Sequence, residues 1–89
     1  MDQQRKVTVL LFGALRNSVP EGNLSLDLPV GARLSDLRKA LSRFFSERGM
    51  EAAVQLLNHS AVGTSDRILK ENETLPPDSV AVLPPVSGG

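Results

Sequence analysis

The chain of 89 residues has room for one small domain with a single hydrophobic core. Its 10 basic and 10 acidic residues give a formal net charge of zero, so no overall field draws it to nucleic acid or to an anionic membrane. It contains no cysteine, which excludes disulfide bonds, a thiolate zinc site and a sulfur nucleophile. No apolar run approaches the roughly 20 residues that span a bilayer, and no signal peptide is recognisable, so we expect a cytoplasmic protein.

Two segments in the first third of the chain are predicted to be strands. Residues 6–12 are rich in β-branched and aromatic residues and are apolar on both faces, which is typical of a central strand. Gly13 ends this segment, and residues 17–23 contain many turn formers, which predicts a loop. Residues 24–28 alternate apolar and polar side chains. They therefore predict an edge strand that pairs with the first as a hairpin.

A helix is predicted over residues 34–48, because the apolar residues change there to a helical period. Gly49 suits the left-handed position that follows the end of a helix. The helix should pack on one face of the sheet through a stripe formed by Leu34, Leu37, Ala40, Leu41, Phe44 and Phe45.

The second half of the chain predicts two further strands. Residues 52–58 form a short apolar run that fits a third strand, and a polar turn follows at 58–60. Residues 63–77 lack periodicity, so they predict a loop with one helical turn near 67–70. The last strand covers residues 79–83 and is ended by two prolines, which cannot donate to a sheet ladder.

This order of elements indicates an α+β roll, with a mixed sheet packed on one main helix. We expect one domain over residues 1–85 and a flexible tail over residues 86–89.

The chain offers little of what an active site of its own would need. His59 is the single histidine, and it lies in a predicted turn, where a solvated side chain is expected rather than a general base. The acidic Glu71, Glu73 and Asp78 lie in a loop where exposed charge is expected, so we predict no metal site. No serine stands in a nucleophile motif, and no glycine-rich phosphate loop is present.

Charge is segregated locally along the chain. Residues 33–48 carry five basic and two acidic residues, whereas from Glu51 onward five acids face two bases. A solvated helix face explains the basic cluster, because the apolar stripe occupies the opposite face. A docking surface for an acidic partner is the alternative. Nucleic acid is not expected, because the chain has no Trp or Tyr on which bases could stack.

The end of the sequence combines features that suit one task. Pro84-Pro85 favours an extended chain directed away from the sheet. Gly88-Gly89 removes the side chains from the last two positions, so the backbone could thread a slot too narrow for a Cβ. The carboxylate of Gly89 would become a good electrophile as an acyl-adenylate, with no side chain hindering the attacking nucleophile. The alternative is a flexible end without a function.

Three segments resemble the ubiquitin-like β-grasp sulfur carriers, and most closely the small subunits of molybdopterin synthase. They are residues 7–16 (VTVLLFGALR), 34–41 (LSDLRKAL) and 79–89 (SVAVLPPVSGG). The last of these carries the most specific motif, PPVSGG, because related carriers for thiamin or tRNA thiolation share the Gly-Gly but usually lack this lead.

The resemblance implies a non-catalytic carrier subunit with no bound cofactor. An E1-like enzyme would use ATP to adenylate Gly89, and a sulfurtransferase or cysteine desulfurase would supply the sulfur for a thiocarboxylate. The tail would then enter the large subunit of the synthase, where sulfur passes to cyclic pyranopterin monophosphate in molybdenum cofactor biosynthesis. A hetero-oligomer of two small and two large subunits is expected by analogy.

The same resemblance assigns the residues that contact partners. Phe12, Val82, Leu83 and Pro84 would lie on or beside an apolar docking patch, and Arg16 matches a position where the family commonly has Arg. Core packing is the alternative for the apolar residues, and a solvated loop charge for Arg16. The full set is Phe12, Arg16, Val82, Leu83, Pro84, Pro85, Val86, Ser87 and Gly88, with Gly89 as the reacting residue.

Two other functions remain open from the residues alone. The same tail chemistry would serve a carrier for tRNA thiolation or another metabolite, or a protein modifier attached to lysines. A β-grasp binding module with an idle tail would bind partners without regard to Gly89.

Overall fold

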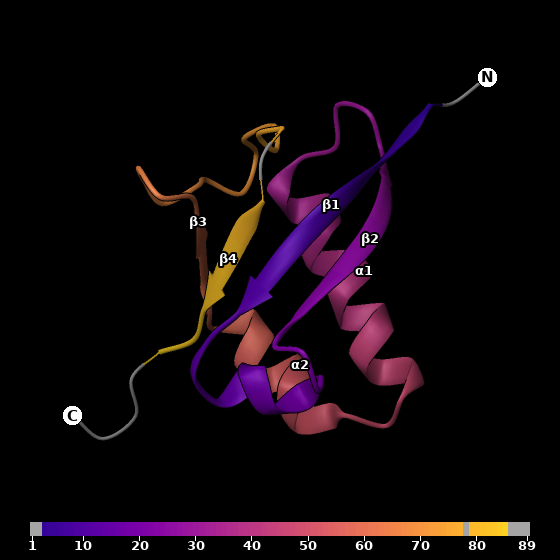
Figure 1. The fold of residues 1–89 in the computed structure, drawn as a ribbon, viewed down its shortest axis with the longest axis vertical. Coiled ribbons are helices and arrows are strands. Elements are labelled where there is room, and N and C mark those ends of the chain that lie inside the picture. Colours follow the sequence, from indigo (N-terminus) through magenta and orange to yellow (C-terminus); the bar gives the residue numbers. More distant parts are fainter. Residues whose placement is uncertain (1–2, 78, 86–89) are drawn as a thin grey trace.

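The protein is built in two layers. The computed structural model describes residues 3–77 and 79–85 of the chain. A four-stranded sheet forms one layer, and two helices cover one of its faces (Figure 1). The elements in chain order are β1 (Gln4–Leu11), the 3-10 helix η1 (Gly13–Ser18), β2 (Asn23–Pro29), α1 (Leu34–Glu47), α2 (Glu51–Asn58), β3 (Ala61–Gly63) and β4 (Val80–Leu83).

The sheet has the strand order β2-β1-β4-β3. β1 and β2 are antiparallel, from Gln4 opposite Pro29 to Leu10 opposite Asn23, which confirms the predicted hairpin. β1 and β4 lie side by side in parallel, and β3 pairs antiparallel with β4. A mixed sheet packed on one main helix confirms the α+β roll that the order of elements predicts.

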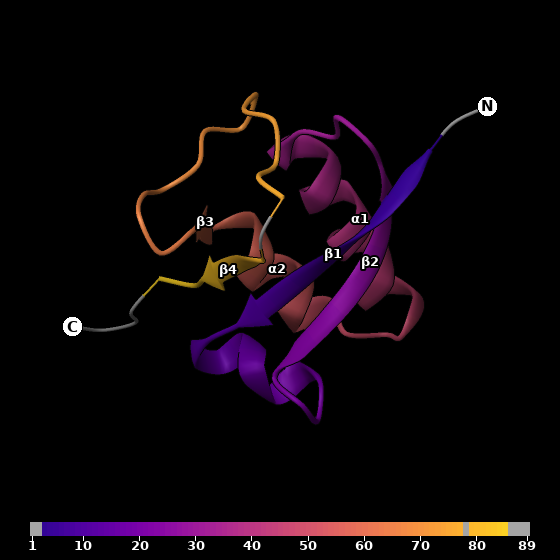
Figure 2. The same cartoon turned by 45° about the horizontal axis from the view of Figure 1, so that its top comes forward.

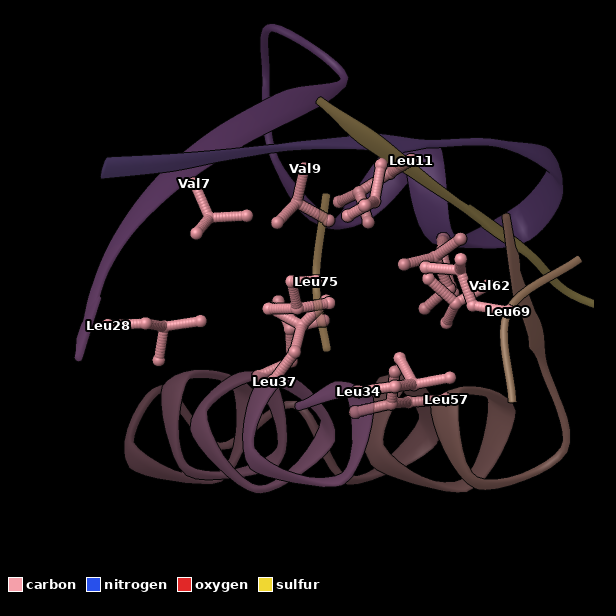
Figure 3. Close-up of a cluster of buried hydrophobic side chains, with 14 of the residues drawn as sticks. Val7, Val9, Leu11, Leu28, Leu34, Leu37, Leu57, Val62, Leu69 and Leu75 are labelled. Carbon is pink, nitrogen blue, oxygen red and sulfur yellow. The ribbon is translucent and has the colours of Figure 1, made fainter. Parts of the chain in front are cut away.

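Alternation along β1 separates the two faces of the sheet. Val7, Val9 and Leu11 are almost completely buried. They point toward the helices, within the apolar cluster that fills the space between the two layers (Figure 3). Because successive side chains of a strand point to opposite faces, Leu10 and the extended Phe12 lie on the other face. The helices leave that second face uncovered.

Helix α1 matches its prediction closely. The four apolar residues Leu34, Leu37, Leu41 and Phe45 are fully buried, and the stripe's remaining two members are half-buried at its margin. The backbone N–H of Arg33 donates to the Asp36 carboxylate at 2.9 Å, which satisfies one free donor at the helix start. Gly49 has a φ of +71°, so it takes the predicted left-handed position after the helix. No helix among the described residues is long and apolar enough to cross a membrane.

The segment predicted as a third strand is instead helix α2, so that prediction was wrong. Ala53 and Leu57 are four residues apart and are both buried, as expected for one face of a helix. Glu51 lies in the first turn, where a negative charge is favourable at the positive end of the helix dipole. Eight residues span little more than two turns, so the apolar run alone does not separate a helix from a strand.

The segment after α2 also differs from its prediction. The short strand β3 begins at Ala61, where only a turn and then a loop were expected. There is no helical turn near residues 67–70. Ile68 bridges Gly63 instead, and the Leu69 N–H donates to the Val62 carbonyl at 2.8 Å. This segment shows no apolar period because only single side chains anchor it to the core. These are the buried Leu69 and Leu75.

Candidate functional site

The candidate site lies at the ends of β1 and β4, where the uncovered face of the sheet meets helix α2. These strands are parallel and pair Leu11 with Val82, so both end at the same edge, as Figure 2 shows. One residue further along each strand brings Phe12 beside Leu83. Their side chains are 43% and 38% exposed, which is high for large apolar residues at the end of a sheet. The edge therefore presents an apolar surface at the point where the chain continues into its tail.

These residues line an apolar groove of about 540 Å³. Phe12 and the start of η1 supply one wall, the end of β4 and the two prolines supply the other, and α2 contributes a leucine. We call this the docking groove; its lining residues are Phe12, Gly13, Ala14, Leu56, Leu83, Pro84 and Pro85. Four of the residues that the family resemblance assigned to partner binding are thus brought together in one place.

Val82 does not share this surface. Its side chain is fully buried and belongs to the cluster between the sheet and the helices. It therefore takes the core-packing role that was the alternative for the apolar strand residues. Leu83 follows Val82 in β4 and points to the opposite face of the sheet. Val82 is therefore next to the docking groove in sequence but does not line it.

Arg16 lies outside the docking groove. It belongs to η1 and is exposed, and its side chain runs across Gly22 in the turn that leads into β2. A Cβ added at Gly22 would lie 3.1 Å from both Cγ and Nε of Arg16. The buried Leu15 anchors η1 beneath it. The structure thus places Arg16 at the hairpin turn, next to the groove's wall in sequence but not among its lining residues.

The predicted tail residues Val86, Ser87, Gly88 and Gly89 lie outside the described residues, so the tail's threading stays a prediction. Three groove residues, Gly13, Ala14 and Leu56, were not predicted from the sequence. Leu56 was assigned to a strand, whereas it is a partly buried residue of helix α2 that packs at the margin of the core and also lines the groove. Gly13 was interpreted only as the residue that ends a strand. Its position directly after an apolar strand could have indicated that it lies beside the groove.

Comparison with known proteins decides the family. No protein-family model matches the chain. One relative is 40% identical over 88 residues, which cover 93% of this chain and 96% of the relative: the molybdopterin synthase sulfur carrier subunit of Synechococcus elongatus. The chain belongs to that family. The resemblance seen in the sequence is thereby confirmed.

The fold of this sulfur carrier subunit is also found in a solved structure. SAMP1 from Haloferax volcanii matches it with a TM-score of 0.69 and 21% identity, over 96% of this chain and 100% of the SAMP1 chain. The likeness at this identity concerns the fold, and it confirms the ubiquitin-like β-grasp class.

A second, more polar groove of about 680 Å³ lies on the same face of the carrier subunit. It runs between the outer side of β1 and the turn at residues 64–67, over the first half of β4. Phe12 lines both grooves and so lies at the boundary between the polar groove and the docking groove.

The acidic loop of the carrier subunit is stabilised by ion pairs. Glu73 accepts the Lys70 backbone N–H at 3.1 Å and pairs with Arg67. The Lys70 N–H is the largest cause that lowers the pKa of the Glu73 carboxyl; desolvation raises this pKa in part, and the Arg67 guanidinium lowers it further, so the net pKa lies below its ordinary value. Glu71 pairs with Arg38 at 2.7 Å. Among residues 3–77 and 79–85 no three potential ligands gather to hold a metal ion, and Asp78 lies outside that part of the chain.

The basic face of α1 is partly committed to intramolecular contacts. The Arg38 side chain is only 21% exposed, and it donates to the Leu57 carbonyl at 2.9 Å and to the Ser60 carbonyl at 2.7 Å, at the end of α2. The Arg48 guanidinium lies 3.7 Å from the centre of the Phe44 ring. Both arginines serve the fold, whereas Arg33, Lys39 and Arg43 are exposed to solvent, as expected for a solvated helix face.

Proposed function

We propose that this carrier subunit works through the carboxyl group of Gly89 as the end of the chain. A carboxylate oxygen attacks the α-phosphorus of ATP and pyrophosphate leaves, which forms an acyl-adenylate. Hydrosulfide then adds to the acyl carbon and AMP leaves, which gives the thiocarboxylate directly. If the sulfur comes as a protein persulfide, its attack gives an acyl disulfide, and a thiol must reduce that S–S bond to release the thiocarboxylate. The thiocarboxylate donates this sulfur to cyclic pyranopterin monophosphate in the biosynthesis of the molybdenum cofactor.

The residues of the carrier subunit suit a passive role in this chemistry. The chain has no cysteine, so sulfur must travel on a carbonyl carbon rather than on a side chain. His59 is exposed at the end of α2, outside the lining of the docking groove, and is not a general base for this reaction. The catalytic side chains therefore belong to the partners, and ATP is a substrate of the activating enzyme rather than a cofactor of this subunit.

One observation supports this function most strongly. The docking groove ends at Pro85, which lies four residues before Gly89 in the sequence. A protein bound in the groove would therefore have the tail immediately beside it. Because apolar residues form most of the lining, the groove suits a stable protein partner better than a small polar substrate.

A sulfur carrier subunit of a synthase implies a second, larger subunit, and we place that subunit on the docking groove. An E1-like adenylating enzyme would use the same groove at a different time, because it too must reach Gly89. A sulfurtransferase or cysteine desulfurase would supply the sulfur. The assembly would contain two small and two large subunits, and the reaction would take place in the cytoplasm.

Deletion of Gly88-Gly89 tests the proposal. The two residues follow the folded domain, so the variant should melt at the temperature of the full chain and still bind the large subunit. Synthase activity of the reconstituted complex should be lost completely, because no carboxyl group reaches the partner's active site. Activity retained by the deletion variant would contradict the proposal.

A further inference from the structure

Gly13 and Pro84 meet where the chain leaves the sheet. The parallel register pairs Leu11 with Val82, so two further residues along each strand bring position 13 beside position 84. Gly13 has a φ of +59°, in the left-handed region that glycine adopts without a steric penalty. A Cβ at position 13 would lie 2.9 Å from Cγ and 3.7 Å from Cδ of Pro84. The first distance is well inside the separation at which carbon atoms attract one another, about 3.5 to 4.0 Å.

Neither Pro84 nor the backbone at Gly13 can easily move to make room for a side chain at position 13. The pyrrolidine ring of Pro84 is closed onto its own backbone, so it cannot swing aside as the end of a long side chain would. Pro84 also has no N–H with which to pair to β1. Pro84 therefore adds no ladder hydrogen bond at this position, and its ring lies close to Gly13 instead. A side chain at position 13 would push either the ring or the start of η1 out of place.

We propose that Gly13 is a positioning residue for the carrier tail. Its missing side chain lets Pro84 lie against the junction of β1 and η1, and this contact sets the direction in which the chain leaves the docking groove. The inference rests on the proposed function, because that direction matters only if Gly89 must reach the active site of a partner bound in the groove.

The length of the tail makes the reaction sensitive to this direction. Five residues lead from Pro84 to Gly89, which is at most about 17 Å of extended chain. Once a partner's slot holds the tail extended, a rotation of about 10° at Pro84 would move its far end by about 3 Å. A misplacement of about 1 Å at the reacting atoms can slow a reaction about 100-fold.

The test compares Gly13→Ala with Gly49→Ala. Gly49 has a φ of +71°, and a Cβ added there meets nothing within 4 Å. Both variants force alanine into the left-handed region, but only the first displaces Pro84. Each variant, loaded as its thiocarboxylate, is mixed with saturating large subunit, and the single-turnover rate of sulfur transfer, the Kd and the melting temperature are measured.

We expect Gly13→Ala to slow transfer at saturation by about tenfold or more, with a smaller change in Kd. Gly49→Ala should lower the melting temperature comparably and leave the rate within about twofold of wild type. Equal rates for the two variants would overturn the proposal, because backbone strain alone would then account for the effect.

A second pair of variants keeps the proposal falsifiable if Gly13→Ala does not fold. Pro84→Ala removes Cγ and Cδ, so it should slow transfer at saturation while the domain stays folded; an unchanged rate would overturn the proposal. In that background, Gly13→Ala should slow transfer less than about threefold further, because the clash is gone. The same slowing in both backgrounds would also overturn it. A wild-type chain that transfers no sulfur would refute the proposed function itself.

Discussion

Replacement of Leu83 by aspartate gives the sharpest test of the docking groove. Leu83 is 38% exposed, which leaves roughly 70 Å² for a partner to cover, and covering it contributes about 2 kcal/mol of binding free energy at about 25 cal/mol per Å². An aspartate carboxylate would in addition lose water in an apolar groove, which costs about 1 to 3 kcal/mol more. Together these terms predict that Leu83→Asp weakens binding of the large subunit about 100-fold or more.

The fold should survive this change, because Leu83 points away from the core. The low β-propensity of aspartate costs about 1 kcal/mol, so the melting temperature should fall by less than about 8 °C. Isothermal titration with the large subunit measures the affinity, and Val30→Asp is the matched control. Val30 is 60% exposed and follows Pro29, which pairs with Gln4 at the opposite end of β1. Unchanged affinity of Leu83→Asp would refute the docking groove, and so would its unfolding, which would make Leu83 a core residue.

Two further predictions concern the ion pairs that stabilise the domain. Arg38→Met should lower the free energy of unfolding by about 2 to 3 kcal/mol, because the Leu57 and Ser60 carbonyls lose a charged donor, whereas Glu71→Gln should cost less than about 1 kcal/mol. Equal costs in urea unfolding would contradict this reasoning. Since the pKa of Glu73 is lowered from 4.5, its stabilisation is present above that pH and is lost as the pH falls. The stability difference between wild type and Glu73→Gln should therefore shrink toward about pH 3, and a growing difference would count against the assigned contacts.

The length of an element decided how well the sequence predicted it. Helix α1 repeats its apolar period over 14 residues, and the prediction was right to within one residue at its end. Helix α2 has eight residues, and an apolar run of that length fits either a strand or a helix. Packing against α1 and the core decides that it is a helix. β3 has three residues and is defined by its pairing with β4, which no local pattern reveals.

The candidate site was predicted in part for a similar reason. Phe12 and Leu83 were identified through the family resemblance, and the parallel register then brought them together. Leu56 and Gly13 were missed because their roles depend on distant segments: α2 must be a helix, and Pro84 must lie against position 13. Contacts between residues so far apart in the chain follow from topology rather than from local sequence.

The intact mass of the protein tests the central claim most directly. The full chain is incubated with ATP, the activating enzyme and a sulfur donor, and the Gly88-Gly89 deletion is treated in parallel. We predict a mass gain equal to the replacement of one oxygen by sulfur in the full chain and no gain in the deletion variant. No gain in the full chain, under conditions in which an established carrier is modified, would contradict the account of Gly89 as the site that carries sulfur.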